Sequence, residues 1–130
     1  MDSSHNQLFI NGCWKLSESG QTFVTLDPST EEPICEAARG TAKDVDLAVR
    51  AAESALHGPW QQISPATRGE LLYCLAELIQ TNRIELARIE TRDVGKPLKI
   101  SLGDIDGVVA TLRYNAGAND KMQGDTINVY

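Results

Sequence analysis

Three cysteines, Cys13, Cys35 and Cys74, are the only thiols that could act as nucleophiles in this sequence. A catalytic thiol needs a lowered pKa, usually from a nearby base or an electropositive helix end. Cys13 instead follows the glycine of a predicted turn, and Cys35 falls in a short predicted strand. Cys74 lies one residue away from the leucine stripe of a predicted helix. We therefore expect packing roles for all three cysteines and no catalytic residue within residues 1–130.

Acidic and phosphate-binding motifs are equally sparse. Asp104 and Asp106 are two positions apart on a predicted helix, so they do not face each other as acid and base carboxylates would. A solvated helix face is the favoured interpretation. The sequence has neither Gly-x-Gly-x-x-Gly nor a Walker-type loop, and His5 and His57 are too isolated to form a metal site. No cofactor-binding residue is therefore expected in this chain.

The composition excludes several classes of protein. A chain of 130 residues with 42% hydrophobic residues is long enough for one globular domain with a single core. Eighteen acidic residues against 12 basic ones give a net charge of −6, which disfavours nucleic-acid binding. No apolar run reaches the ~20 residues that span a bilayer, and the start lacks a signal peptide, so no membrane partner is expected. Three widely spaced cysteines suit a reducing compartment and predict a cytoplasmic protein.

The first forty residues read as β-structure after a disordered start at residues 1–7. Asn11-Gly12 between two apolar segments is a strong hairpin signal, because this pair tolerates the positive φ angles of a type I′ turn. The β-branched and aromatic segment 22–26 predicts a strand that ends before Pro28. Residues 34–38 predict a further short strand.

From Thr41 the apolar residues recur at helical spacing. Thr41, with Asp44 three positions later, predicts a capped helix start, and Ser64-Pro65 predicts a second one. Asn82 resembles the cap of a third helix, which Gly95 ends. The predicted buried stripe of the first helix consists of Val45, Ala48, Val49, Ala52, Ala55 and Leu56. That of the second consists of Leu71, Leu72, Leu75, Leu78 and Ile79.

A fourth, unusually long helix is predicted from Leu98 to about Gln123. Gly103, Gly107 and Gly117 weaken it by up to ~1 kcal/mol each relative to alanine, which indicates close packing or free space beside the helix. The final segment, 127–130, has the composition of a strand without a partner. The terminal helix and this strand need surfaces that the chain does not supply.

A colinear series of short segments runs from Leu8 to Thr126 and covers nearly the whole chain. Its members are Leu8-Phe9-Ile10-Asn11-Gly12 with Trp14, Thr22-Phe23, Asp27-Pro28-Ser29-Thr30, Ala42 to Ala52, Pro59-Trp60, Arg68 to Leu72, Leu75 to Ile79, Glu90 to Pro97 and Leu112 to Gly117. The series resembles the N-terminal part of the aldehyde dehydrogenase superfamily.

The resemblance implies an α/β fold in which a hairpin and short strands precede four helices, as part of a larger Rossmann-like cofactor domain. Residues 8–126 would be the N-terminal part of that domain, and 127–130 would begin the oligomerisation strand. The parent, meaning the full-length enzyme, would form homo-oligomers and use NAD or NADP. A downstream cysteine would attack a small-molecule aldehyde, and a downstream glutamate would activate water. None of these catalytic residues is expected in this chain.

The resemblance also implies a site for a monovalent cation, Na⁺ or K⁺. Backbone carbonyls at Thr25 and Leu26 and the carboxylate of Asp93 match the family's ligands, and a further carbonyl would come from beyond this chain. A hard cation takes oxygen ligands, and Asp93 near a helix C-terminus otherwise opposes the negative helix end. The alternative is that Asp93 only caps or pairs locally.

The long helix is implied to line the substrate entrance of the parent. Asp104, Gly107 and Thr111 repeat at spacings of three and four and therefore share one face. A glycine at position 107 would widen a tunnel mouth that a bulkier residue would narrow.

Departures from the family pattern put the substrate subgroup in doubt. Arg92 and Val94 stand where an apolar residue and Asn are usual, and Ala118-Asn119 stand where Trp-Ala is common. Two other interpretations remain: a non-catalytic binding or structural module that associates with full-length relatives, and an unrelated helical interaction domain.

Overall fold

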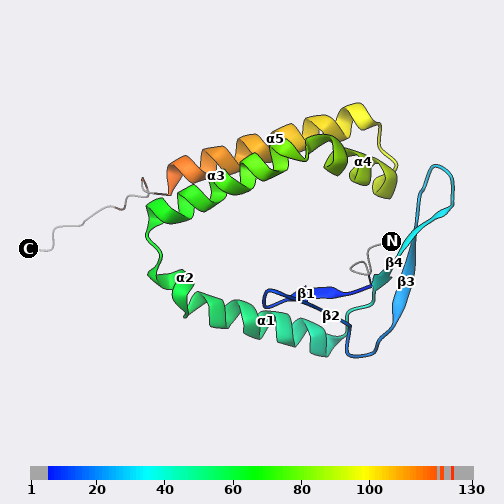
Figure 1. Cartoon of the computed structure of the whole chain (residues 1–130), viewed down its shortest axis with the longest axis horizontal. Coiled ribbons are helices and arrows are strands. Elements are labelled where there is room, and N and C mark those ends of the chain that lie inside the picture. The colour runs from blue at the N-terminus through cyan, green and yellow to red at the C-terminus, as the bar shows by residue number, and fades with distance from the viewer. Residues whose placement is uncertain (1–5, 120, 122–123, 125–130) are drawn as a thin grey trace, which may run out of the picture. The chain divides into compact units, whose positions relative to one another are not determined.

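A computed structural model describes residues 6–119, 121 and 124, and its strands precede its helices as predicted (Figure 1). The strands are β1 (Leu8–Ile10), β2 (Cys13–Lys15), β3 (Thr22–Leu26) and β4 (Pro33–Ala38). The helices are α1 (Ala42–Leu56), α2 (Pro59–Gln62), α3 (Pro65–Thr81), α4 (Arg83–Val94) and α5 (Leu98–Ala118).

The described residues form two compact units. The first unit lies within residues 1–62 and 90–96, and the second lies within residues 63–89 and 97–130. A single core was expected from the chain length, but the contacts divide instead between these two groups of elements.

The predicted hairpin is present in the first unit. β1 and β2 pair antiparallel, with Phe9 opposite Trp14, and Asn11 and Gly12 have φ angles of 54° and 73°. Positive φ at both central residues is the conformation that a type I′ turn requires. Within the described residues the hairpin has no third strand. Three residue pairs join its strands, together with a contact between two aromatic rings whose centroids are 5.0 Å apart.

The second sheet of this unit is also an antiparallel pair. β3 faces β4 in a register that runs from Thr22 opposite Ala38 to Leu26 opposite Pro33, with an irregularity between Thr25 and Leu26. The intervening turn places Glu31 at a φ of 61°. Proline opposite Leu26 has no backbone N–H, so regular pairing ends there.

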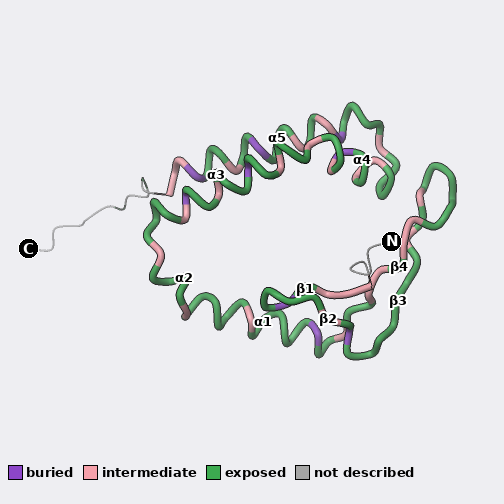
Figure 2. Tube along the Cα trace, in the orientation of Figure 1, coloured by how far each residue is buried: buried purple, intermediate pink, exposed green. Residues whose placement is uncertain are grey.

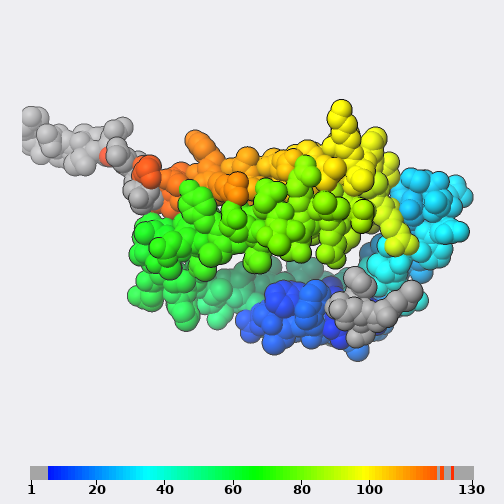
Figure 3. Space-filling view, turned by 45° about the horizontal axis from the view of Figure 1, so that its top comes forward, coloured from blue at the N-terminus to red at the C-terminus, as the bar shows by residue number. Residues whose placement is uncertain are grey.

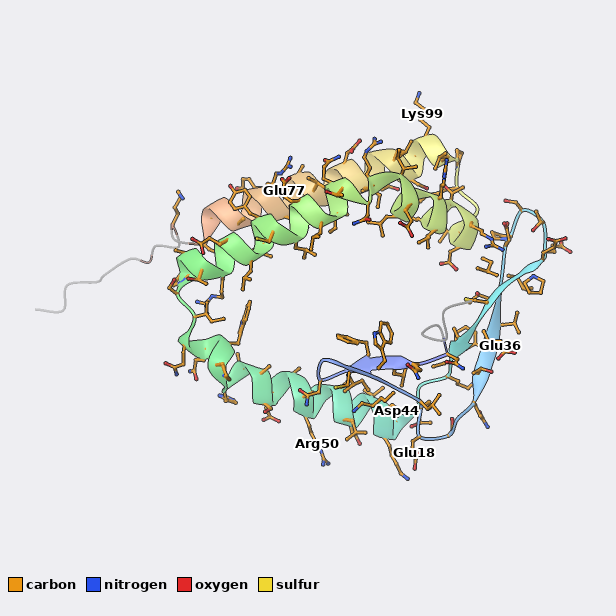
Figure 4. The ribbon with its side chains drawn as sticks, in the orientation of Figure 1. Glu18, Glu36, Asp44, Arg50, Glu77 and Lys99 are labelled. Carbon is orange, nitrogen blue, oxygen red and sulfur yellow. The ribbon has the colours of Figure 1, made fainter. Side chains whose placement is uncertain are left out.

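A buried carboxylate connects the start of α1 to the loop after β2. Thr41 caps α1 as predicted, and the Asp44 side chain completes the capping box. Asp44 is 3% exposed and accepts hydrogen bonds from the Thr41 backbone N–H at 2.8 Å and the Ser17 hydroxyl at 2.8 Å. The Glu18 backbone N–H donates to Asp44 Oδ1 at 3.1 Å, and Figure 4 shows Glu18 and Asp44 beside the first turn of α1.

These donors determine how Asp44 responds to acid. The Thr41 backbone N–H is the largest cause that holds the pKa of Asp44 at about 2, below its ordinary 3.8. Burial opposes the shift, and Ser17 and Glu18 add to it. Because the folded-state pKa is lowered, Asp44 stabilises the fold above pH 3.8 and loses this contribution as the pH falls towards 2.

We therefore expect the stability difference between the native chain and Asp44→Asn to shrink as the pH falls from 3.8 to about 2. The asparagine keeps the size of the side chain but cannot become an anion. Urea unfolding followed by circular dichroism, at a series of pH values, measures the difference. A difference that stays constant across this range would show that the anion contributes nothing to the capping network.

The boundaries of α3 and α4 follow local signals with one exception. Ser64 caps α3, its hydroxyl accepting from the Thr67 backbone N–H at 3.1 Å. Gly95 ends α4 at a φ of 74°. Asn82 does not cap α4 as predicted: its Nδ2 donates to the Leu78 carbonyl at 2.8 Å, so it caps the end of α3. The tight junction places its side chain within reach of the helix that precedes it.

Two differences concern the helix count and the length of the last helix. A one-turn helix, α2, follows α1 where only a helix end was predicted, so the described residues contain five helices and not four. Pro59 suits the first position of such a turn, and the Gln61 N–H donates to the Gly58 carbonyl at 3.1 Å. α5 ends at Ala118 and does not reach Gln123. The predicted strand at 127–130 lies outside the described residues.

α3 and α5 pack side by side in the second unit, with the start of α3 beside the end of α5 (Figures 1 and 3). The contact uses small residues. A Cβ added to Gly69 would lie 2.7 Å from the Ala116 carbonyl oxygen, so the two backbones approach closely there. Ala76 and Val109 are buried in the same unit.

Few hydrophobic side chains are buried, as Figure 2 shows. Among the described residues the buried hydrophobic ones are Ile10, Ala76, Ala87, Val109 and Ala116. The predicted stripes are largely exposed: Val45 is 60% exposed on α1, and Leu78 is 62% exposed on α3. Helical spacing marks an apolar face correctly but does not supply the surface that would cover it. No described helix is both long and apolar enough to cross a membrane.

Candidate functional site

The three predicted entrance residues lie together on α5. Asp104, Gly107 and Thr111 line one open groove of about 500 Å³ along this helix. Their spacing of three and four positions places them on one face, as predicted. The structure adds three lining residues: Gly103, Val108 and Leu112.

The two glycines of this groove leave free space. A Cβ added at Gly103 or Gly107 would meet no heavy atom within 4 Å. Glycine costs an exposed helix up to about 1 kcal/mol relative to alanine, and here no close packing compensates that cost. Free space is therefore the correct one of the two explanations that the sequence left open for Gly103 and Gly107. Gly117 differs, because its added Cβ would lie 3.7 Å from the Tyr73 hydroxyl.

Ion pairs fix α5 against the neighbouring helices. Arg83 donates to both carboxylate oxygens of Asp106, from Nε to Oδ1 at 2.5 Å and from Nη2 to Oδ2 at 2.6 Å. Arg113 donates to Glu77 at 2.5 Å. The hydrogen bond from Arg83 is the main cause that lowers the pKa of Asp106 below its ordinary value. Asp106 thus pairs with Arg83 while Asp104 lines the groove, so the two aspartates do not form an acid and base pair.

The predicted cation ligands all belong to the first unit. Thr25 and Leu26 end β3, and Asp93 lies exposed in the last turn of α4. Gly95, two positions after Asp93, lies against the turn that follows β3, because a Cβ added to it would be 2.7 Å from Pro28 Cγ. The end of α4 therefore approaches the end of β3.

The end of β3 faces a residue without a backbone N–H. Pro33 faces Leu26 and has no N–H that could donate to the Leu26 carbonyl. The Thr25 hydroxyl donates to the Cys35 carbonyl at 3.3 Å. Carbonyl oxygens with one carboxylate make a donor set of the kind that hard cations accept. Among the described residues, no three His, Cys, Asp or Glu side chains are grouped as a metal site.

The three cysteines are free, and none of them lines the groove on α5. Cys13 and Cys74 are exposed, and Cys35 is half-buried beside Thr25, whose hydroxyl is 3.4 Å from its Sγ. The packing role expected of Cys13 and Cys74 is therefore not seen within the described residues. Both lie on surfaces whose apolar neighbours are also exposed, such as Trp14 and Leu75.

A second apolar groove was not predicted. It runs along the junction of α3 and α4 and is lined by Leu78, Ile79, Asn82, Glu85, Leu86 and Ile89. The sequence carried a partial signal for it, because Leu78 and Asn82 are four positions apart at the end of α3, and Glu85 and Ile89 are four positions apart on α4. Sequence reasoning assigned Leu78 and Ile79 to a core instead.

Known proteins share both the sequence and the fold of this chain. The family model "Aldehyde dehydrogenase family" matches residues 14–130. A mitochondrial aldehyde dehydrogenase of Rattus norvegicus is 50% identical over 127 residues, covering 95% of this chain and 24% of the rat protein. Retinaldehyde dehydrogenase 3 of Homo sapiens is 45% identical over 130 residues, covering 98% of this chain and 25% of the human protein.

Solved structures give the same result. An aldehyde dehydrogenase from Bacillus cereus in complex with NAD⁺ is 40% identical, with a TM-score of 0.92 over 97% of this chain and 26% of that one. A protein of Burkholderia cenocepacia described as a putative aldehyde dehydrogenase is 41% identical, with a TM-score of 0.91 over 94% of this chain and 26% of that one. The chain spans about a quarter of the length of these relatives. With a family model that matches residues 14–130, the chain belongs to the aldehyde dehydrogenase family.

Proposed function

We propose that this chain is the N-terminal quarter of an NAD(P)-dependent aldehyde dehydrogenase. The parent oxidises an aldehyde to a carboxylic acid through a thiohemiacetal on a cysteine outside residues 1–130. The observation that carries the proposal is the match over residues 14–130, together with relatives at 45–50% identity that align with about a quarter of their length. NAD or NADP accepts the hydride in the parent, and no residue of this chain is assigned to holding it.

The first unit has a structural role in this proposal. The ends of β3 and α4 hold Na⁺ or K⁺ through the carbonyls of Thr25 and Leu26 and the carboxylate of Asp93. Two observations support this role: the close approach of Gly95 to Pro28, and the missing N–H opposite Leu26. A carboxylate in the last turn of α4 is unfavourable beside the helix C-terminus, and a bound cation would offset that repulsion.

The groove on α5 is the substrate entrance of the parent in this proposal. Its open glycines admit bulky aldehydes, and Asp104 and Thr111 supply polar groups at the mouth. The ion pairs of Asp106 and Arg113 keep the helix in place while substrate passes.

We expect Gly107→Leu in the parent to raise KM for a bulky aromatic aldehyde by roughly tenfold or more and to leave acetaldehyde oxidation nearly unchanged. The leucine side chain fills space that no atom occupies within 4 Å of the glycine. Steady-state kinetics with both substrates measure the ratio. Lys99→Leu is the matched control, because Figure 4 shows Lys99 pointing away from α5 and it does not line the groove. Equal changes for the two aldehydes would rule out an entrance role for Gly107.

The parent is further proposed to be a cytoplasmic homo-oligomer that acts on a small-molecule aldehyde. The three free cysteines support a reducing compartment. The acidic balance of −6 supports a small-molecule partner over nucleic acid.

The alternative is a non-catalytic module that associates with full-length relatives. The exposed hydrophobic residues favour association of some kind, since Leu78, Ile84 and Ile89 are each more than half exposed near the α3 and α4 groove. Reading the coding DNA beyond Tyr130 separates the two proposals. An open frame that continues to a cysteine motif supports the enzyme, whereas a stop codon after Tyr130 supports the module.

A further inference from the structure

The turn between β1 and β2 presents an amide that can react with its own backbone. Asn11 is the only asparagine followed by glycine in this sequence. Both residues are exposed, and no heavy atom lies within 4 Å of a Cβ added to Gly12. Gly12 therefore has no side chain of its own beside its backbone nitrogen, and no residue beyond its two chain neighbours fills the place of one. We propose that Asn11 is a site of spontaneous deamidation.

The reaction needs only water. The Gly12 nitrogen loses its proton and bonds to Asn11 Cγ, while the Cγ–Nδ2 bond breaks and nitrogen leaves as ammonia with that proton. The product is a five-membered succinimide. Water then opens the ring at one of two carbonyls: cleavage at Cγ gives aspartate, and cleavage at the main-chain carbonyl gives isoaspartate. No oxidant or metal takes part, and the peptide gains one carboxylic acid.

The short hairpin allows the turn to open for this attack. Asn11 must leave its left-handed conformation before the Gly12 backbone nitrogen can reach the Asn11 carboxamide. β1 and β2 contribute three pairs and, in the described part of the chain, no third strand joins them. An isolated two-stranded hairpin is marginally stable in water. Phe9 and Trp14 add one aromatic contact but are 59% and 57% exposed, so separating the two rings breaks little buried packing, and Ile10 at 7% is the one buried residue of the two strands.

Other asparagines supply internal controls. Asn82 and Asn115 lie at or within helices, and the Nδ2 of each donates to a carbonyl four positions earlier at 2.8 Å. Their carboxamides are held, and an ordinary side chain follows each of them. Neither asparagine is both exposed in a turn and followed by glycine, as Asn11 is.

Modification changes the hairpin. Either product adds a negative charge to the turn. Isoaspartate also inserts a methylene group into the main chain of a two-residue loop whose length sets the strand register. The pairing of Phe9 with Trp14 is therefore lost in the isoaspartate form.

The test incubates the whole 130-residue chain in mildly alkaline buffer and follows the tryptic peptide that ends at Lys15 by tandem mass spectrometry. We expect a gain of about one mass unit at Asn11, with isoaspartate detected by enzymatic methylation, and no change at Asn82 or Asn115. Asn11→Gln should block the reaction. An unmodified Asn11, or equal modification at Asn82, would overturn the proposal.

A second variant tests the opening step. Phe9→Ala removes the aromatic pair and should raise the open population, and with it the rate at Asn11, by roughly two- to fivefold. Leu56→Ala is the matched control, because Leu56 is as exposed as Phe9, at 59%, but ends α1. An unchanged rate in Phe9→Ala would show that the hairpin does not limit the attack and would overturn that part of the proposal.

Discussion

The 130-residue chain alone is expected to give no aldehyde-dependent reduction of NAD or NADP. Its cysteines show no feature that would activate a thiolate. Cys13 and Cys74 are exposed on apolar surfaces, and Cys35 is beside a threonine hydroxyl and not beside a base. The absorbance of reduced nicotinamide, followed with several aldehydes at high chain concentration, measures the activity. A full-length relative should reduce the nicotinamide under the same conditions, whereas the rate of the 130-residue chain should lie below the detection limit.

Variants of the three cysteines provide the control. Cys13→Ser, Cys35→Ser and Cys74→Ser should leave the background rate of the chain unchanged. Turnover that disappears with one of these replacements would place a nucleophile within residues 1–130. It would also remove the main reason for assigning the chemistry to another part of the parent.

Gly69→Ala is expected to destabilise the α3 and α5 pair despite the better helix propensity of alanine. The new Cβ would lie 2.7 Å from the Ala116 carbonyl oxygen, a backbone atom that cannot move without shifting α5. Overpacking of this kind lowers the free energy of unfolding by about 1–3 kcal/mol. The better helix propensity of alanine adds at most about 1 kcal/mol, so the overpacking has the larger effect. Urea unfolding followed by circular dichroism at helical wavelengths should show a lower midpoint.

Gly103→Ala is the matched control because it makes the same change on α5 where nothing lies within 4 Å. It should raise the unfolding free energy by up to about 1 kcal/mol. If both variants shift the midpoint in the same direction, helix propensity decides the outcome and the close approach at Gly69 carries no energetic weight.

Elements with a local chemical cause could be predicted from the sequence. The positive φ of Asn11 and Gly12, the caps at Thr41 and Ser64, and the end of α4 at Gly95 each depend on a few neighbouring residues. The shared face of the groove residues is equally local, since it follows from helical spacing alone.

Features that depend on distant surfaces could not be predicted. The apolar stripes of α1 and α3 are visible in the sequence, yet Val45, Leu71 and Leu78 are exposed. The helical spacing of apolar residues does not show whether another surface covers them. Asn82 shows a similar limit, because a residue between two helices can cap either one, and the structure assigns it to α3. The buried connection of Asp44 to Ser17 joins residues 27 positions apart and left no pattern in the sequence.

The ion pairs between α5 and its neighbours also suggest an order of folding. The bond from Arg83 to Asp106 closes a loop of 23 positions, and that from Arg113 to Glu77 closes one of 36. The contact of Gly69 with Ala116 closes a longer loop still. Each doubling of loop length costs about 0.6 kcal/mol of chain entropy. The contacts between α3 and α5 should therefore form first near α4 and last at Gly69. The closest backbone approach then forms last, so crowding at Gly69 should speed unfolding more than it slows folding.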